Sequence, residues 1–240
     1  GINGWEFSVE GYYKDMRNVL EYKDGVSFFG SSSGWENKVE MGKGRSAGIE
    51  FMAQKTAGKT TGWLSYTLSK SDRKFTKGGI NNGEWFPYKY DRRHSINLTI
   101  NHKFSDRIDI GASWVFYTGG TSTIPEEKTT VIRPHNGANN GFLWYGTYDN
   151  TNSSPTIGDV SYIEHRNNFR LPASHRLSLG VNFNKKTKHG MRTWNISLYN
   201  AYNAMNPAWV YRGHNKQGLS VIKKYTLLPL IPSFTYTYKF

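Results

Sequence analysis

Two short motifs contain residue types that could support catalysis or phosphate binding. Residues 30–34 read Gly-Ser-Ser-Ser-Gly, the pattern of a nucleophilic serine held on a sharp strand-to-helix turn. No helical pattern follows, and a run of Gly and Ser is typical of a flexible loop. Residues 42–46 read Gly-Lys-Gly-Arg-Ser, but they lack the full spacing of a phosphate-binding loop and lead into a strand. Neither motif predicts a catalytic site.

Metal and thiol chemistry find equally little support in the sequence. The chain has seven histidines and no cysteine, which excludes a disulfide, a thiolate metal site and a cysteine nucleophile. No two histidines are three or four residues apart, so no structural metal site is indicated. A metal site whose ligands come from separate loops remains an alternative. We expect no enzyme activity, no bound metal and no cofactor.

The elements that would position any site are indicated by apolar and polar residues alternating with a period of two. The clearest case is residues 95–104, where Ile96 and Leu98 alternate with Asn97 and Thr99. This pattern is typical of a β-strand with one apolar face. The same pattern predicts eight strands, within residues 5–14, 47–54, 62–69, 95–104, 108–117, 176–184, 192–199 and 234–240.

The connections between these strands alternate strictly between long and short. They cover residues 15–43, 56–60, 70–91, 105–107, 118–172, 185–190 and 200–224. Tight turns on one side and extended loops on the other are typical of a membrane-spanning β-barrel, whereas a soluble sandwich has no reason to follow this rule. No apolar run approaches the roughly 18 residues that a transmembrane helix needs. The sequence therefore predicts an all-β fold, a transmembrane antiparallel β-barrel segment of about eight strands.

The distribution of charged and polar residues indicates a wide barrel and an anionic partner. The net charge is +13, which suggests nucleic acid, an acidic ligand or lipid phosphate as partner. The cations are dispersed near strand ends, as in Lys103, Arg107 and Lys185, which favours lipid phosphates over nucleic acid. The predicted polar face holds mainly Ser, Thr, Asn and Gly, with scattered Asp109, Arg176 and Arg192 among its charges. Such small residues would not fill an eight-stranded barrel, so we expect a piece of a larger one.

Five motifs occur in an order that is similar to a known family. They are Gly-Trp-Leu-Ser-Tyr-Thr-Leu-Ser-Lys-Ser at 62–71, Phe-Pro-Tyr-Lys-Tyr-Asp-Arg-Arg-His at 86–94, Asn-Ala-Tyr-Asn at 200–203, Leu-Leu-Pro at 227–229 and the final Tyr-Lys-Phe. Together they resemble the last barrel strands of TonB-dependent outer-membrane receptors. The resemblance covers the chain from end to end.

This resemblance implies an architecture, a location and an activity. Residues 1–240 would be the C-terminal part of a barrel of about 22 strands, closed by an N-terminal plug that this chain lacks. We expect no signal segment at Gly1 because the chain begins directly in strand-like sequence. The protein would lie in the outer membrane of a Gram-negative bacterium and import a scarce siderophore, vitamin, glycan or peptide with energy from the TonB complex. A passive porin or a self-standing adhesive barrel is the alternative.

Candidate ligand residues lie in the predicted outer loops. Aromatic rings there offer stacking faces and arginines offer forked donors for carboxylate or phosphate. The candidates are Trp85, Arg92, Arg93, Arg133, Trp144, Tyr145, Tyr148, Arg166 and Arg170.

The C-terminal strand ends in aromatic residues spaced by two, Phe234, Tyr236, Tyr238 and Phe240. This pattern resembles the signal that the barrel-insertion machinery reads. Expected partners are therefore that machinery, the TonB complex through the plug, and outer-membrane lipid with lipopolysaccharide. A surface lipoprotein is a further candidate partner, and nucleic acid is not expected.

Overall fold

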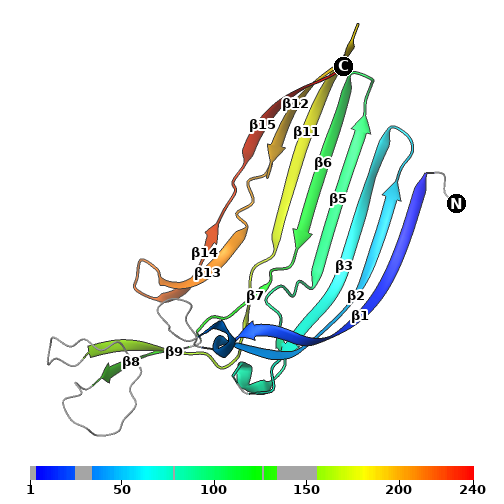
Figure 1. Cartoon of the computed structure of the whole chain (residues 1–240). Helices are drawn as coiled ribbons and strands as arrows, with labels where there is room; N and C mark the ends of the chain where they lie inside the picture. The colour runs from blue at the N-terminus through cyan, green and yellow to red at the C-terminus, as the bar shows by residue number, and fades with distance from the viewer. Residues whose placement is uncertain (1–3, 25–33, 78, 126, 134–155) are drawn as a thin grey trace.

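The computed structural model describes residues 4–24, 34–77, 79–125, 127–133 and 156–240. Its main feature is an antiparallel sheet in which eight long strands pair in chain order (Figure 1). These strands are β1 (Trp5–Tyr22), β2 (Val39–Lys55), β3 (Thr60–Lys74), β5 (His94–Lys103), β6 (Ile108–Tyr117), β11 (Ser174–Thr187), β12 (Gly190–Tyr199) and β15 (Ile231–Lys239). The predicted set of eight antiparallel strands is confirmed. The first three strands are longer than the alternation indicates.

The long connections contain the remaining elements. A two-residue strand, β4 (Phe86–Pro87), pairs with β3, and three small two-stranded sheets lie outside the main one. These are β7 (Thr121–Ser122) with β10 (Phe169–Arg170), β8 (Glu127–Arg133) with β9 (Thr156–Tyr162), and β13 (Pro207–His214) with β14 (Ser220–Thr226). Two short 3-10 segments, Trp35–Lys38 and Asn81–Gly83, complete the described elements. Within these described ranges, no helix has the length and apolarity to cross a membrane.

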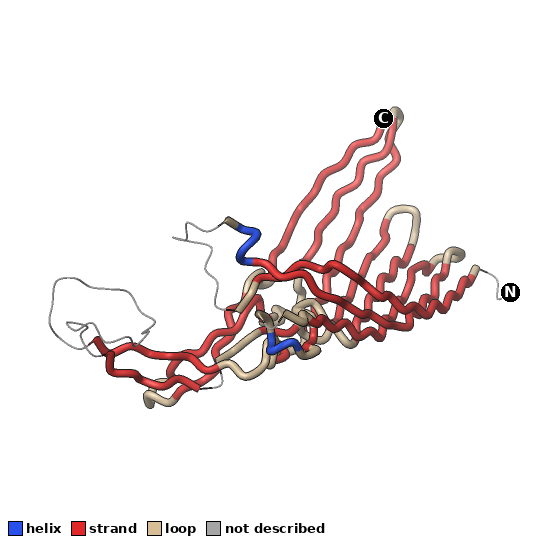
Figure 2. The backbone as a smooth tube through the Cα atoms, turned by 60° about the horizontal axis from the view of Figure 1, so that its bottom comes forward, coloured by secondary structure: helices blue, strands red, loops and turns tan. Residues whose placement is uncertain are grey.

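Short and long connections lie at opposite ends of the sheet (Figure 1). Residues 56–59, 104–107 and 188–189 form the short turns, and the C-terminus lies at the same end. The long connections and their small sheets gather at the other end, called the loop end below. The sheet curves into an open trough (Figure 2). Its edge strands are β1 and β15, which do not pair with each other, so the described strands form an open sheet.

Strand register collects the apolar side chains on one face. One row across six strands consists of Phe7, Ala53, Leu64, Leu98, Trp114 and Leu177. No described element covers this face: Trp194 is 44% exposed and Ile196 is 50% exposed. The buried apolar cluster is small and consists of Phe75, Ile80 and Phe86 in the connection after β3. The fold therefore lacks a hydrophobic core beneath the part of the sheet described.

The opposite face is polar and its side chains bond to one another across strands. Asp109 accepts hydrogen bonds from the side-chain amides of Asn182 at 2.7 Å and Asn184 at 2.6 Å. Asn195 donates to Asn182 at 2.7 Å, and Thr193 donates to Asn184 at 2.8 Å. This ladder joins β6, β11 and β12 and satisfies polar groups that the sheet half-buries.

One residue lies on the face opposite to the predicted one. Arg192 pairs in register with Lys185 and Tyr238, and it shares the apolar face with Trp194. The assignment of Arg192 to the polar face is wrong because β12 has no register shift between the two residues. Arg192 lies beside the short turn, where a long side chain can extend past the apolar band to polar surroundings.

The side-chain ladder should contribute measurably to stability. Asp109→Ala leaves the amides of Asn182 and Asn184 without their acceptor, so we expect the free energy of unfolding to fall by about 1–3 kcal/mol. Ser178→Ala, on the same face but outside the ladder, should change it by less than about 0.5 kcal/mol. Urea unfolding of the folded protein measures both. Equal stability of the two variants would show that the ladder contributes nothing.

Candidate functional site

Asp91 holds the segments of the loop end together. This residue is 1% exposed. Its carboxylate accepts a hydrogen bond from Arg170 Nη2 at 2.6 Å, from Arg93 Nε at 3.2 Å and from the backbone N–H of Ser71 at 2.7 Å. Arg170 Nη1 also donates to the backbone carbonyls of Asp91 at 2.6 Å and Gly119 at 2.9 Å. Two segments distant in sequence, at Ser71 and at Arg170, are thereby fixed to one carboxylate.

A second ion-pair cluster forms around Arg166. Its guanidinium lies 3.3 Å from Glu21 Oε1 and 2.9 Å from Asp24 Oδ1, and it donates to the carbonyl of Tyr22. The backbone N–H of Arg166 donates to the Asn81 side chain at 2.7 Å. This cluster ties the segment before β10 to the end of β1 and to the connection after β3.

The predicted ligand residues thus fall into three groups. Arg93, Arg166 and Arg170 are engaged by carboxylates of this chain. Trp85 and Arg92 each form a cation–π contact: Arg45 lies 4.3 Å from the Trp85 ring, and Arg92 lies 3.9 Å from the Tyr117 ring. The remaining predictions, the side chain of Arg133 with Trp144, Tyr145 and Tyr148, lie outside the described residues. Ligand binding by any of the nine stays a prediction.

Two adjoining hollows lie at the loop end. The first has a volume of about 170 Å³ and is bounded by the ends of β6, β11 and β12 and by residues 206–208 and 227–228. The second has a volume of about 310 Å³ and lies between residues 89–92, 119–122, 171–174 and 207–210. They share Tyr117, Ser174, Pro207 and Ala208. We call the two together the loop-end groove.

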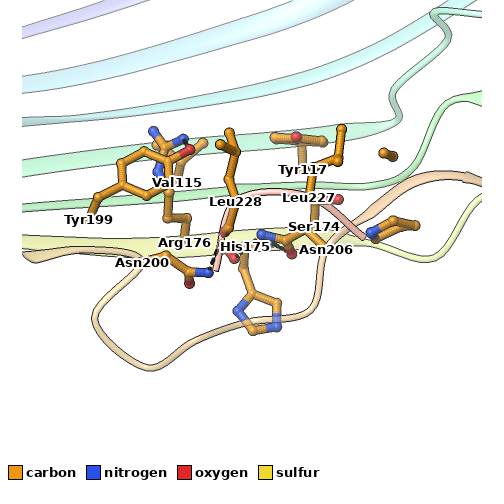
Figure 3. Close-up of a pocket in the computed structure, with 12 residues that line it drawn as sticks. Val115, Tyr117, Ser174, His175, Arg176, Tyr199, Asn200, Asn206, Leu227 and Leu228 are labelled. Atoms are coloured by element: carbon orange, nitrogen blue, oxygen red, sulfur yellow. Dashed lines mark hydrogen bonds between the residues drawn. The ribbon is translucent and has the colours of Figure 1, made fainter. Parts of the chain in front are cut away.

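Two groove residues were not recognised as candidate ligand residues from the sequence. Arg176 Nη1 donates to the Tyr199 hydroxyl at 2.5 Å, and its guanidinium lies 4.4 Å from the centre of the same ring. Both side chains lie on the same side of β11, whereas His175 points away from the other side (Figure 3). One sequence feature could have identified Arg176: it is an arginine on the predicted polar face, next to a long connection.

Asn200 fixes the wall of the first hollow. This residue is 1% exposed and has a φ of 53°, in the left-handed region that Asn tolerates. Its side-chain amide donates to the carbonyls of Ala204 at 3.0 Å and Leu228 at 3.1 Å, and its side-chain oxygen accepts from the Ala204 N–H. Two motifs noted in the sequence, at 200–203 and 227–229, are therefore joined by these bonds.

Phe234, Tyr236 and Tyr238 lie on the apolar face, opposite to the face on which Arg176 and Tyr199 lie. Phe234 and Tyr236 pack on Trp194, with ring centroids 5.1 and 4.5 Å away. Tyr238 lies 6.2 Å from Phe240, which is fully exposed. Their role as an assembly signal stays a prediction.

Metal-binding geometry is absent from the described part of the chain, where no three His, Asp or Glu side chains gather. A carboxyl with a lowered pKa lies in the turn after β5. There the hydrogen bond and charge of Lys103, with Lys186 adding to them, lower the pKa of Asp106. This exposed ion pair does not belong to the loop-end groove.

The sequence matches no model of a protein family, and comparison with curated proteins finds no match either. The candidate site therefore rests on geometry and chemistry alone.

Removal of the Asp91 carboxylate should loosen the loop end. Asp91→Ala leaves Arg170 and Arg93 without their shared partner, so we expect the free energy of unfolding to fall by about 2–4 kcal/mol. Faster proteolysis within residues 79–93, 118–125 and 163–173 should accompany the loss. Asp15→Ala is the control, because its ion pair with Arg17 is exposed, and it should change stability by less than about 1 kcal/mol. Unchanged proteolysis in Asp91→Ala would contradict this role.

Proposed function

We propose that this chain is the C-terminal part of an outer-membrane β-barrel of about 22 strands, which binds a scarce extracellular ligand and imports it with TonB-supplied energy. The observation that carries the proposal is the two-faced sheet, with one apolar face uncovered and all long connections at one end. The resemblance of five ordered motifs to TonB-dependent receptors supplies the class of activity.

The apolar face supports contact with lipid. Each square ångström of apolar surface exposed to water costs about 25 cal/mol, and soluble monomers rarely expose contiguous apolar patches above a few hundred Å². A row that crosses six strands without a covering element is therefore poorly suited to water. In a bilayer the same face satisfies the outward side of a barrel, and the long free edges of β1 and β15 would pair with further strands.

The polar face favours a barrel that is closed by a plug and imports with energy, rather than an open pore. Asp109, Asn182 and Asn195 bond to one another across three strands, and small hydrogen-bonding residues of this kind suit a lumen that holds a folded plug. A porin constriction more often presents clustered charge of one sign. A passive porin or an adhesive barrel nevertheless shares the sheet, the loops and the uncovered face, and it is the second candidate.

The proposed location specifies the partners. The TonB complex would act through the plug, outside this chain. Outer-membrane lipid and lipopolysaccharide would contact the apolar face and its flanking cations. The insertion machinery would read Phe234, Tyr236, Tyr238 and Phe240, of which the first three share the apolar face.

Two neighbouring substitutions on β5 test membrane insertion. Leu98 lies between Leu64 and Trp114 on the apolar face, while Thr99 lies between Trp63 and Ser113 on the polar face. Leu98→Lys should lose about 2–4 kcal/mol of stability in a bilayer, because the charge faces lipid. Thr99→Lys should insert normally, since it faces the lumen. Outer-membrane yield and urea unfolding in vesicles measure the difference. Equal tolerance of both lysines would exclude a lipid-facing sheet.

Energy dependence separates an importer from a porin. Cells that carry the full-length protein should accumulate its ligand only while the inner-membrane proton gradient is intact, and deletion of TonB should abolish uptake. A barrel mutant that still binds ligand at the surface provides the control for binding without transport. Uptake that continues after the gradient collapses would contradict the importer assignment and favour a passive pore.

A further inference from the structure

We propose that the loop-end groove binds the oxyanion group of the ligand, a carboxylate or a phosphate, through Arg92 and Arg176. This inference rests on the proposed import function and narrows its ligand to an anionic molecule. Neutral glycans and cationic peptides would then be excluded as the preferred cargo.

Each of the two arginines stacks on a tyrosine of the polar face at the loop end. Arg92 packs on Tyr117 at 3.9 Å, and Arg176 packs on Tyr199 at 4.4 Å. Tyr117 pairs with Ser174, while Val115 pairs with Arg176. Tyr117 and Arg176 are therefore diagonal neighbours on adjacent strands, about 7–8 Å apart. A ligand of a few ångströms placed over Tyr117 can reach both guanidinium groups.

Neither arginine gives its charge to a described carboxylate, and of the Arg176 donors Nη1 is used by the Tyr199 hydroxyl. Arg93, Arg166 and Arg170 each pair with a carboxylate, whereas neither Arg92 nor Arg176 forms an ion pair with a described residue. A ring stacked on the face of a guanidinium leaves the N–H groups at its edge free for a forked contact with an oxyanion. Aromatic stacking thus orients both arginines without consuming their charge.

Arg176 also has a buried donor without an acceptor. Its Nε has no hydrogen-bond partner in the described structure. A buried N–H left unpaired is unfavourable, and native proteins rarely retain one without a reason. A ligand oxygen in the first hollow would supply the missing acceptor.

The rest of the groove favours negative charge. Its described lining contains no Asp or Glu, and Lys89 adds a third cation on the ring of Tyr90 at 5.0 Å. Trp209 and Leu171 in the second hollow offer apolar contact to the body of a ligand. A neutral ligand would remove water from three cations without providing a counter-charge, which is unfavourable.

Calorimetry on the full-length protein in detergent micelles tests the site with defined probes. The probes are inorganic phosphate, and galacturonate against galactose, which differ by one carboxylate. We expect saturable binding of phosphate and galacturonate, and at least tenfold weaker binding of galactose. Arg92→Gln and Arg176→Gln should each weaken the binding of both anions about ten- to hundredfold.

Arg107→Gln is the matched control, because it removes the same charge from the short turn at the opposite end. It should leave anion binding unchanged. If Arg176→Gln fails to fold by circular dichroism, Arg92→Gln tests the groove independently, since Arg92 lies in a connection. The site is overturned if neither anion binds saturably, if galactose binds as well as galacturonate, or if the folded arginine variants bind like the parent.

The outcome is separable from that of the import proposal. Anion binding that ignores both arginines, with uptake that still requires the proton gradient, overturns the groove alone. Anion binding that depends on them, with uptake that persists without the gradient, overturns the importer and retains the groove.

Discussion

The constraint on which the structure depends is the alternation of side chains along strands whose two faces meet different surroundings. A slip of one residue in any strand would exchange its Leu, Ile and Phe for the Asn and Ser of the other face. Register is therefore fixed wherever the apolar row runs. The described register shift of β1 falls between Arg17 and Val19, at Asn18 with a φ of 57°. It lies near the loop end, ten residues or more beyond Phe7 in the apolar row.

The loop end obeys a different rule, because its segments cannot use the sheet ladder to satisfy their backbone groups. Ion pairs and amide bonds replace that ladder. Arg170 bonds to Asp91 across 79 positions of sequence, and Arg166 reaches Glu21 across 145. Because most of these arginines are held by carboxylates of the chain, the positive charge left for a ligand is concentrated in the few that stack on tyrosine instead.

The sheet was predictable from the sequence because a period of two is a local signal, and Leu98 beside Thr99 already indicates the two faces. The extensions of β1 to β3 were not, since their ends depend on pairing with neighbours rather than on alternation. The role of Arg93 and Arg170 was equally hidden. An arginine fork fits a ligand carboxylate and Asp91 equally well, and the choice depends on which segments meet. The face on which Arg192 lies, by contrast, could have been derived from the sequence, because Arg192 is two residues from Trp194 on the same strand.

Two of the motifs that carry the family resemblance stabilise the loop end of the sheet. Asp91 within residues 86–94 gathers two arginines, and Asn200 within residues 200–203 holds Leu228. Residues with such structural roles indicate the architecture and carry little information about the chemistry of a ligand. Ligand chemistry must then be inferred from loop-end residues that have no counter-charge within the described chain. Arg92 and Arg176 meet that criterion, so the proposed groove would favour an anion, although the resemblance alone is compatible with many kinds of ligand.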